Sequence, residues 1–166
     1  MPTLHRIQPC LWFDTQAEEA AAFYTGIFPD SNLSAVSRYA EAGREQHGKT
    51  PGSVMSVSFE LLGQPFLALN GGPHFKFTKA VSLMVLCDTQ DEIDRYWSAL
   101  SQGGDPAAQQ CGWLKDRYGV SWQITPSMFA DWISAPDRAA VERYMSAMMP
   151  MKKLDIARLQ QAFDGR

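Results

Sequence analysis

The hydrophobic and polar positions near the N-terminus change their period at one point. From Ile7 to Phe13 they alternate, which is typical of a strand with two different faces, whereas from Gln16 to Phe28 apolar residues recur at helical spacing. Pro9 lacks an N–H group, so this strand is expected at a sheet edge or at a seam between sheets. The same change of period separates residues 80–87 from residues 91–100. The pattern predicts a strand followed by a helix in both places.

A short sequence repeats at these two points. Asp14-Thr15-Gln16 recurs as Asp88-Thr89-Gln90, 74 residues later, and in both copies a Glu follows the Thr by three residues. A Thr hydroxyl and a Glu carboxylate at this spacing can satisfy the free N–H groups at the start of a helix. The repeat predicts a duplicated module in which both helices begin with a capping box.

Further strand-like runs follow each helix, separated by Gly-containing turns that favour hairpins. These runs are residues 33–39, 54–60, 65–70, 109–114 and 120–125, with a polar loop at 40–52. The first half therefore reads β-α-β-β-β, and the repeat indicates the same β-α-β-β-β plan for the second half, where two such runs follow the helix. We expect an α+β fold of two tandem βαβββ modules with a helical C-terminal tail.

The end of the repeat at Pro126 sets the expected domain organisation. One domain is predicted over residues 1–126, with module one at about 4–73 and module two at about 79–126. A helical extension follows over residues 127–166.

The extension contains two helix-like segments, 137–149 and 155–163, with Asp137 and Asp155 as N-caps. Its methionines, Met145, Met148 and Met149, lie on one face of the first segment. Such a stripe favours a packing or dimer surface, because Met fills irregular apolar gaps.

Composition narrows the class of protein. Hydrophobic residues make up 45% and charged residues 20% of the 166 residues, which is typical of a globular protein and not of a disordered one. The net charge is −3, and Lys and Arg are scattered, so we expect no nucleic-acid partner. No segment has the length of apolar sequence that a membrane span requires, and the three cysteines have no CxxC spacing. A cytoplasmic protein with reduced thiols is expected.

Four groups of segments, in order along nearly the whole chain, resemble the PhnB-like branch of the vicinal oxygen chelate superfamily, which includes glyoxalase I and the bleomycin-resistance proteins. They are Ile7–Asp14; Ala17–Ala20 with Phe23-Tyr24; Gly63–Phe66 with Ala68–Pro73; and Cys111–Asp116 with Gly119–Ile124. The resemblance extends to the tail segment Lys152–Ile156. Relatives in this branch carry the label 3-demethylubiquinone-9 3-methyltransferase. The turns after the two first strands contain no Gly, which a nucleotide-binding methyltransferase fold needs.

The resemblance implies where a metal would bind in glyoxalase I and related enzymes. Carried over by position, its ligands correspond to Gln8, Ser82, Gln123 and about Ala68. These residues offer amides, a hydroxyl and a methyl group, whereas a divalent cation requires carboxylates or imidazoles. We therefore predict no metal and no cofactor.

Strand alternation predicts the lining of a pocket instead. Its expected ligand-binding residues are Gln8, Trp12, Asn70, Ser82, Met84 and Gln123, with Leu86, Ala68 and Ser121 nearby. The alternative is that these side chains fill a small core, although buried amides would then each need hydrogen-bond partners. Cys10 lies on the same predicted face and is the candidate catalytic nucleophile or acid.

Three functions follow as hypotheses. The first is a PhnB-like protein that binds or transforms a small molecule in a metal-poor pocket. The second is a non-catalytic protein that sequesters a drug or metabolite, similar to the bleomycin-resistance proteins. Methyl transfer ranks last because of the missing Gly-rich turn. The resemblance also implies a homodimer.

Overall fold

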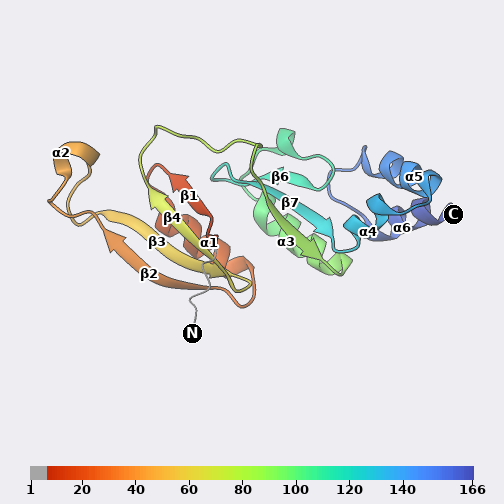
Figure 1. The fold of residues 1–166 in the computed structure, drawn as a ribbon, viewed down its shortest axis with the longest axis horizontal. Helices are drawn as coiled ribbons and strands as arrows, with labels where there is room; N and C mark the ends of the chain where they lie inside the picture. Colours follow the sequence, from red (N-terminus) through yellow and green to blue (C-terminus); the bar gives the residue numbers. More distant parts are fainter. Residues whose placement is uncertain (1–6) are drawn as a thin grey trace. The chain divides into compact units, whose positions relative to one another are not determined.

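Two sheets, one in each of two units, carry the alternating hydrophobic pattern of the chain (Figure 1). The structure is a computed structural model that describes residues 7–166. The units are Met1–Lys76 and Phe77–Arg166, so the chain divides close to the predicted junction between the modules. The start of module one predicted near residue 4 lies outside the described residues.

The first unit is a βαβββ module with one short additional helix. Its elements are β1 Cys10–Phe13, α1 Ala17–Ile27, β2 Asn32–Arg38, α2 Arg44–His47, β3 Val54–Leu61 and β4 Gln64–Asn70. The strand order is β1-β4-β3-β2, with β1 parallel to β4 and the other pairs antiparallel. Strand β1 lies at the sheet edge, as Pro9 predicts, but begins at Cys10 and not at Ile7.

Helix α1 forms the core of this unit with one face of the sheet. Its small residues Ala17, Ala20 and Ala21 are fully buried and allow the helix to approach the strands closely. Tyr24 is also fully buried and stacks on Phe59 with ring centroids 6.4 Å apart. Complete burial of such a side chain contributes about 2 kcal/mol to the stability of the module.

The second unit contains the repeated module in a shortened form. Its elements are β5 Leu83–Cys87, α3 Gln90–Ser101, the 3-10 helix η1 Pro106–Ala108, β6 Trp113–Lys115 and β7 Ser121–Pro126. Strands β5 and β7 are parallel, β6 and β7 are antiparallel, and the order is β5-β7-β6. The strand predicted over 109–114 is reduced to β6 and a single bridge between Gln110 and Trp113.

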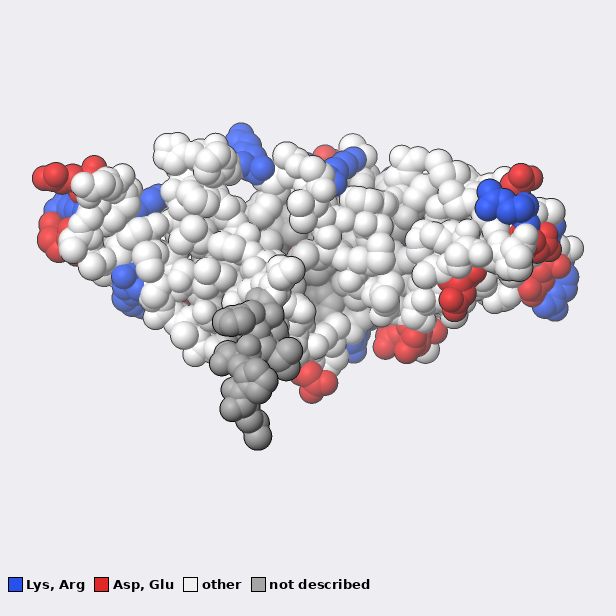
Figure 2. Space-filling model, viewed as in Figure 1, with Lys and Arg blue, Asp and Glu red and all other residues white. Residues whose placement is uncertain are grey.

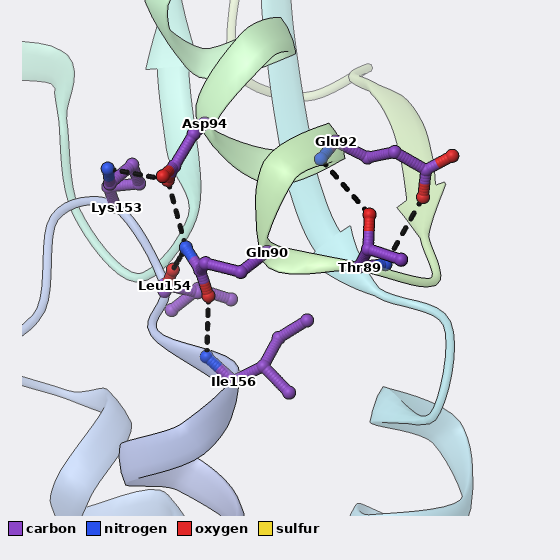
Figure 3. Close-up of polar contacts among 7 residues, drawn as sticks. All are labelled: Thr89, Gln90, Glu92, Asp94, Lys153, Leu154 and Ile156. Atoms are coloured by element: carbon purple, nitrogen blue, oxygen red, sulfur yellow. Dashed lines mark hydrogen bonds and ion pairs between the residues drawn. The ribbon is translucent and has the colours of Figure 1, made fainter.

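The two helices begin differently despite their common sequence. In α3 the capping box is present: Glu92 N–H donates to Thr89 Oγ1 at 3.2 Å, and Glu92 Oε2 accepts from Thr89 N–H (Figure 3). The box predicted for α1 is wrong, because Gln16 is the N-cap residue and no side chain of the predicted pair caps the helix.

The C-terminal extension forms three helices within the second unit. They are α4 Phe129–Ser134, α5 Arg138–Met148 and α6 Ile156–Asp164. Asp137 and Asp155 cap α5 and α6 as predicted. The methionines of the predicted stripe differ in burial. Met148 is buried in the core of the extension, whereas Met149 is exposed.

The side chain of Gln90 ties the extension to module two (Figure 3). Its Oε1 accepts a hydrogen bond from Ile156 N–H at 2.9 Å, and its Nε2 donates to the carbonyl of Leu154 at 3.1 Å. The same Nε2 donates to Asp94, which also pairs with Lys153 at 2.6 Å. In the second copy of the repeated tripeptide, the third residue, Gln90, therefore joins module two to the C-terminal extension.

Candidate functional site

Within residues 7–166, one face of each sheet is packed against a helix, α1 in the first unit and α3 in the second, and the other face is not. In the first unit, the face toward α1 carries the buried residues Leu11, Phe13, Val57, Phe59 and Ala68. We call the opposite side the helix-free face. In the first unit, this face carries Cys10, Trp12, Ser56, Ser58, Leu67 and Leu69. None of these six side chains is fully buried.

Trp12 has a fixed position on this face. Its Nε1 donates to the carbonyl of Gly72 at 2.9 Å, and its ring meets Phe75 edge-on with centroids 4.9 Å apart. The indole lies so close to Gly71 that a Cβ at residue 71 would be 2.1 Å from it. Because Phe75 remains 65% exposed, the pair presents an ordered aromatic surface to solvent.

The helix-free face of the second unit combines apolar and amide groups. Met84 and Leu86 on β5 are 48% and 60% exposed. Gln123 on β7 lies beside Met84 in the parallel register, and its Nε2 donates to Ser82 Oγ at 2.8 Å. The second N–H and the Oε1 of Gln123 have no other partner among residues 7–166, so this amide can orient a polar ligand group.

The predicted pocket residues do not all lie on the helix-free faces. Gln8 is exposed and precedes β1, whereas Ala68 and Asn70 lie on the α1 side, because β4 pairs Leu11 with Ala68 and Phe13 with Asn70. The prediction that Ala68 and Asn70 share a face with Trp12 is therefore wrong. Both ends of the Asn70 amide are engaged: Oδ1 accepts from Ala17 N–H, and Nδ2 donates to the carbonyl of Val54.

The three cysteines differ in environment. Cys10 is an exposed residue, and partial burial of its thiol raises the pKa above the ordinary value. Cys87 is buried, and desolvation, reinforced by Glu92 and Asp88, raises its pKa to about 12. Neither shift favours the reactive thiolate, and activation of Cys10 would require a ligand or a group beyond those around it.

Asp116 is the buried carboxylate that follows strand β6. It accepts hydrogen bonds from Tyr118 N–H, Val120 N–H and the indole of Trp122, at 2.9, 3.0 and 2.8 Å. A buried carboxylate that accepts three hydrogen bonds stabilises the turn between β6 and β7. Both oxygens of Asp116 accept hydrogen bonds from this hairpin, so the residue has a structural role.

The superfamily's metal does not fit the residues at the corresponding positions. The 74-residue repeat makes Met84 equivalent to Cys10. Met84 pairs with Gln123 and Cys10 pairs with Leu67, so the residue equivalent to Gln123 in the first unit is Leu67 and not Ala68. The positions then hold two amides, a hydroxyl and an isobutyl group. Residues 7–166 contain no cluster of three His, Cys, Asp or Glu side chains that could hold a metal ion.

The surface gives two further observations. On the face shown in Figure 2, acidic and basic side chains lie beside one another in small groups, with uncharged surface between the groups. Among residues 7–166, no helix has the length and apolar composition needed to cross a bilayer.

Comparisons with known proteins agree with this architecture. The model of the family described as 3-demethylubiquinone-9 3-methyltransferase matches residues 5–125. A solved structure from Bacillus cereus, described as a putative 3-demethylubiquinone-9 3-methyltransferase, PhnB protein, is 38% identical and has a TM-score of 0.61. The match covers 74% of this chain and 98% of that one.

A second solved structure, protein PA1353 from Pseudomonas aeruginosa, shares the fold with 20% identity and a TM-score of 0.56, over 74% of this chain and 98% of its own. No curated protein matches the chain. The family match ends at residue 125, so the C-terminal helices lie beyond it. With its tandem βαβββ modules, the chain belongs to the 3-demethylubiquinone-9 3-methyltransferase family, the PhnB-like branch of the vicinal oxygen chelate superfamily.

Proposed function

We propose that this PhnB-like protein binds a small, partly apolar molecule on its helix-free faces, without a chelated metal. The observation that carries the proposal is the ordered aromatic pair of Trp12 and Phe75. Its indole is held by a hydrogen bond and by contact with Gly71, so ligand binding would cost little additional side-chain ordering.

Apolar contact and amide orientation supply the expected binding energy. An aromatic contact contributes about 0.5–1.5 kcal/mol beyond the area that it buries. On the helix-free face of the second unit, Met84 and Leu86 offer apolar contact, and a neutral hydrogen bond to Gln123 would contribute about 1 kcal/mol and chiefly orient a ligand bound there. The first unit's face therefore favours a ligand with an aromatic body, and the second unit's face favours an apolar body with a neutral polar group.

Binding needs only these faces, whereas transformation needs an acid, a base or a nucleophile. On the predicted lining, Cys10 is the candidate for that role, and its raised pKa disfavours the thiolate. This observation favours the second hypothesis, a protein that sequesters a drug or metabolite as the bleomycin-resistance proteins do, over catalysis.

Methyl transfer remains the least supported function. S-adenosylmethionine in a nucleotide-binding fold would lie over a Gly-rich turn between a strand and a helix. The turns that follow β1 and β5 are Asp14-Thr15-Gln16 and Asp88-Thr89, and each sheet contains antiparallel pairs. These residues do not fit that cofactor.

A screen of small aromatic fragments by NMR on the full chain tests the proposal. We expect the strongest fragment to shift the indole signal of Trp12, and Trp12→Leu to weaken its binding about tenfold. Trp97→Phe is the matched control, because Trp97 is a half-buried tryptophan on helix α3. Equal losses in both variants, or shifts confined to the helix-covered faces, would reject the proposal.

We also infer a homodimer. Its support is the exposed apolar surface of Met84, Leu86, Met145 and Met149. Sedimentation at micromolar concentration should give twice the mass of the chain, and a monomer there would contradict this inference.

A further inference from the structure

A hollow of about 240 Å³ lies in the first unit, where strands β1 and β4 end and helix α1 begins. It is lined by Asp14, Thr15, Glu18, Tyr39, Lys49, Ser53, Val54 and Asn70. Neither Trp12 nor Phe75 lines this hollow, so the inference drawn from it does not rest on the function proposed above. Its volume is below the roughly 300 Å³ of the smallest usual drug-sized sites, which limits an occupant to a very small molecule.

The backbone at Lys49 is fixed by its neighbours. Lys49 N–H donates to His47 Nδ1 at 2.9 Å, and the His47 ring packs against Tyr39 with centroids 4.7 Å apart. Tyr39 in turn donates its hydroxyl to the carbonyl of Asn70 at 2.8 Å. These contacts hold the loop that carries Lys49 against the end of strand β4.

The ammonium group of Lys49 lies beside Gly72. A Cβ at residue 72 would be 2.8 Å from Lys49 Nζ. Lys49 is half-buried, and no hydrogen bond or ion pair of its ammonium occurs within residues 7–166. A half-buried cation of this kind favours a ligand anion.

Two carboxylates line the same hollow. Asp14 and Glu18 are exposed, and neither lies within 4.0 Å of a cationic nitrogen of the described residues. Positive and negative groups therefore share one small hollow without pairing directly. A simple anion would be attracted by Lys49 but repelled by the two carboxylates. A simple cation would be attracted by the carboxylates but repelled by Lys49.

We propose that this hollow binds a small zwitterion of the α-amino acid class. Its carboxylate would accept charge-assisted hydrogen bonds from Lys49 Nζ, and its ammonium group would donate to Asp14 and Glu18. Both ends of such a molecule find an opposite charge, which neither a carboxylic acid nor an amine alone can achieve.

NMR titration of the ¹⁵N-labelled full chain tests the proposal. The probes are the protein amino acids, added singly at up to 10 mM, and the N-acetyl and amide derivatives of the strongest binder. We expect saturable shifts at residues 14–18, 39 and 49–54, and at least tenfold weaker binding of both derivatives. The proposal is overturned if no amino acid shifts these signals, or if either singly charged derivative binds as tightly as the parent.

Variants locate the contacts. Lys49→Met should weaken binding about tenfold or more, as expected for loss of a charge-assisted hydrogen bond, and Glu18→Gln should weaken it in the same direction. Lys79→Met is the matched control, because Lys79 is an exposed lysine outside the hollow. Equal affinities of Lys49→Met and Lys79→Met would overturn the assignment of the carboxylate to Lys49.

Discussion

Asn70 Oδ1 accepts a hydrogen bond of 2.8 Å from Ala17 N–H, and this contact caps helix α1 from a strand 53 residues away in sequence. The same amide donates to the carbonyl of Val54 at 3.1 Å. A single buried side chain thereby connects α1, β3 and β4. In the second unit, Pro126 takes the corresponding place beside β5, and the helix is capped locally.

Replacing Asn70 tests this connection. Asn70→Ala leaves Ala17 N–H and the Val54 carbonyl without their partner, so we expect the free energy of unfolding to fall by about 1–3 kcal/mol. Asn70→Asp retains the acceptor for Ala17 and should lose less. Urea unfolding of both variants measures the difference, and an Asp variant no better than the Ala variant would contradict the capping role.

The repeated threonines should respond differently to the same change. Thr89→Ala removes the capping box of α3 and should cost about 1 kcal/mol. Thr15→Ala should change stability by less than about 0.5 kcal/mol, because α1 is not capped by Thr15. Chemical denaturation of the two variants side by side provides the test. Equal costs would show that the first copy also uses its Thr as a cap.

Tyr144 carries a buried hydroxyl that finds no hydrogen-bond partner within residues 7–166. Tyr144→Phe removes this unsatisfied group and should raise the free energy of unfolding by about 1 kcal/mol. Tyr39→Phe is the opposite case, since it loses the hydrogen bond to Asn70 and should lower stability by a similar amount. A lower melting temperature for Tyr144→Phe would contradict the structure.

The same residue predicts an alkaline pH dependence. Burial raises the pKa of Tyr144 to about 12, whereas an unfolded tyrosine has a pKa of about 10. The unfolded state therefore loses its proton first, and stability should fall as the pH rises from about 10 toward 12. Tyr144→Phe should have a smaller loss in this window. Parallel loss in the variant and the wild type, measured by urea unfolding, would reject this contribution.

Asp94 predicts a small acid dependence at the junction with the extension. Hydrogen bonds from Lys153 and then Gln90 lower the pKa of its carboxyl. The stabilisation is present above the unfolded pKa, about 3.9, and is lost as the pH falls through the folded value. Because the pair is 41% and 47% exposed, it should contribute less than about 1 kcal/mol.

Asp94→Asn measures this contribution. The variant should be slightly less stable than the wild type at pH 6, and the two should become equal near pH 2. A difference of the same size at both pH values would contradict the role of the ionised carboxyl.

The sequence was sufficient to predict the order of the main strands and helices, because the 74-residue repeat and the change of hydrophobic period are local signals. It did not predict the short helices α2, η1 and α4. The caps of α5 and α6 were predicted for the same reason, since Asp137 and Asp155 act within their own first turns. The cap of α1 was not, because Asn70 reaches Ala17 from a distant strand.

The difference between local and long-range contacts also explains which residues of the candidate sites could be predicted. Alternation within β1 correctly separates Trp12 from Leu11, but it cannot decide which residues of β4 share a face with Trp12. That depends on the pairing register, which places Leu69 and not Ala68 or Asn70 beside it. Lys49 was missed because its loop has no hydrophobic period, and its surroundings at Tyr39 and Gly72 are set by tertiary contacts.

Ligand binding on the helix-free faces should require no metal. The most direct test is the affinity of the strongest aromatic fragment before and after dialysis against EDTA, with the metal content measured on the same samples. We predict an unchanged dissociation constant and no stoichiometric metal. Loss of binding after EDTA, with recovery on addition of Zn²⁺, Ni²⁺ or Mn²⁺, would contradict the claim.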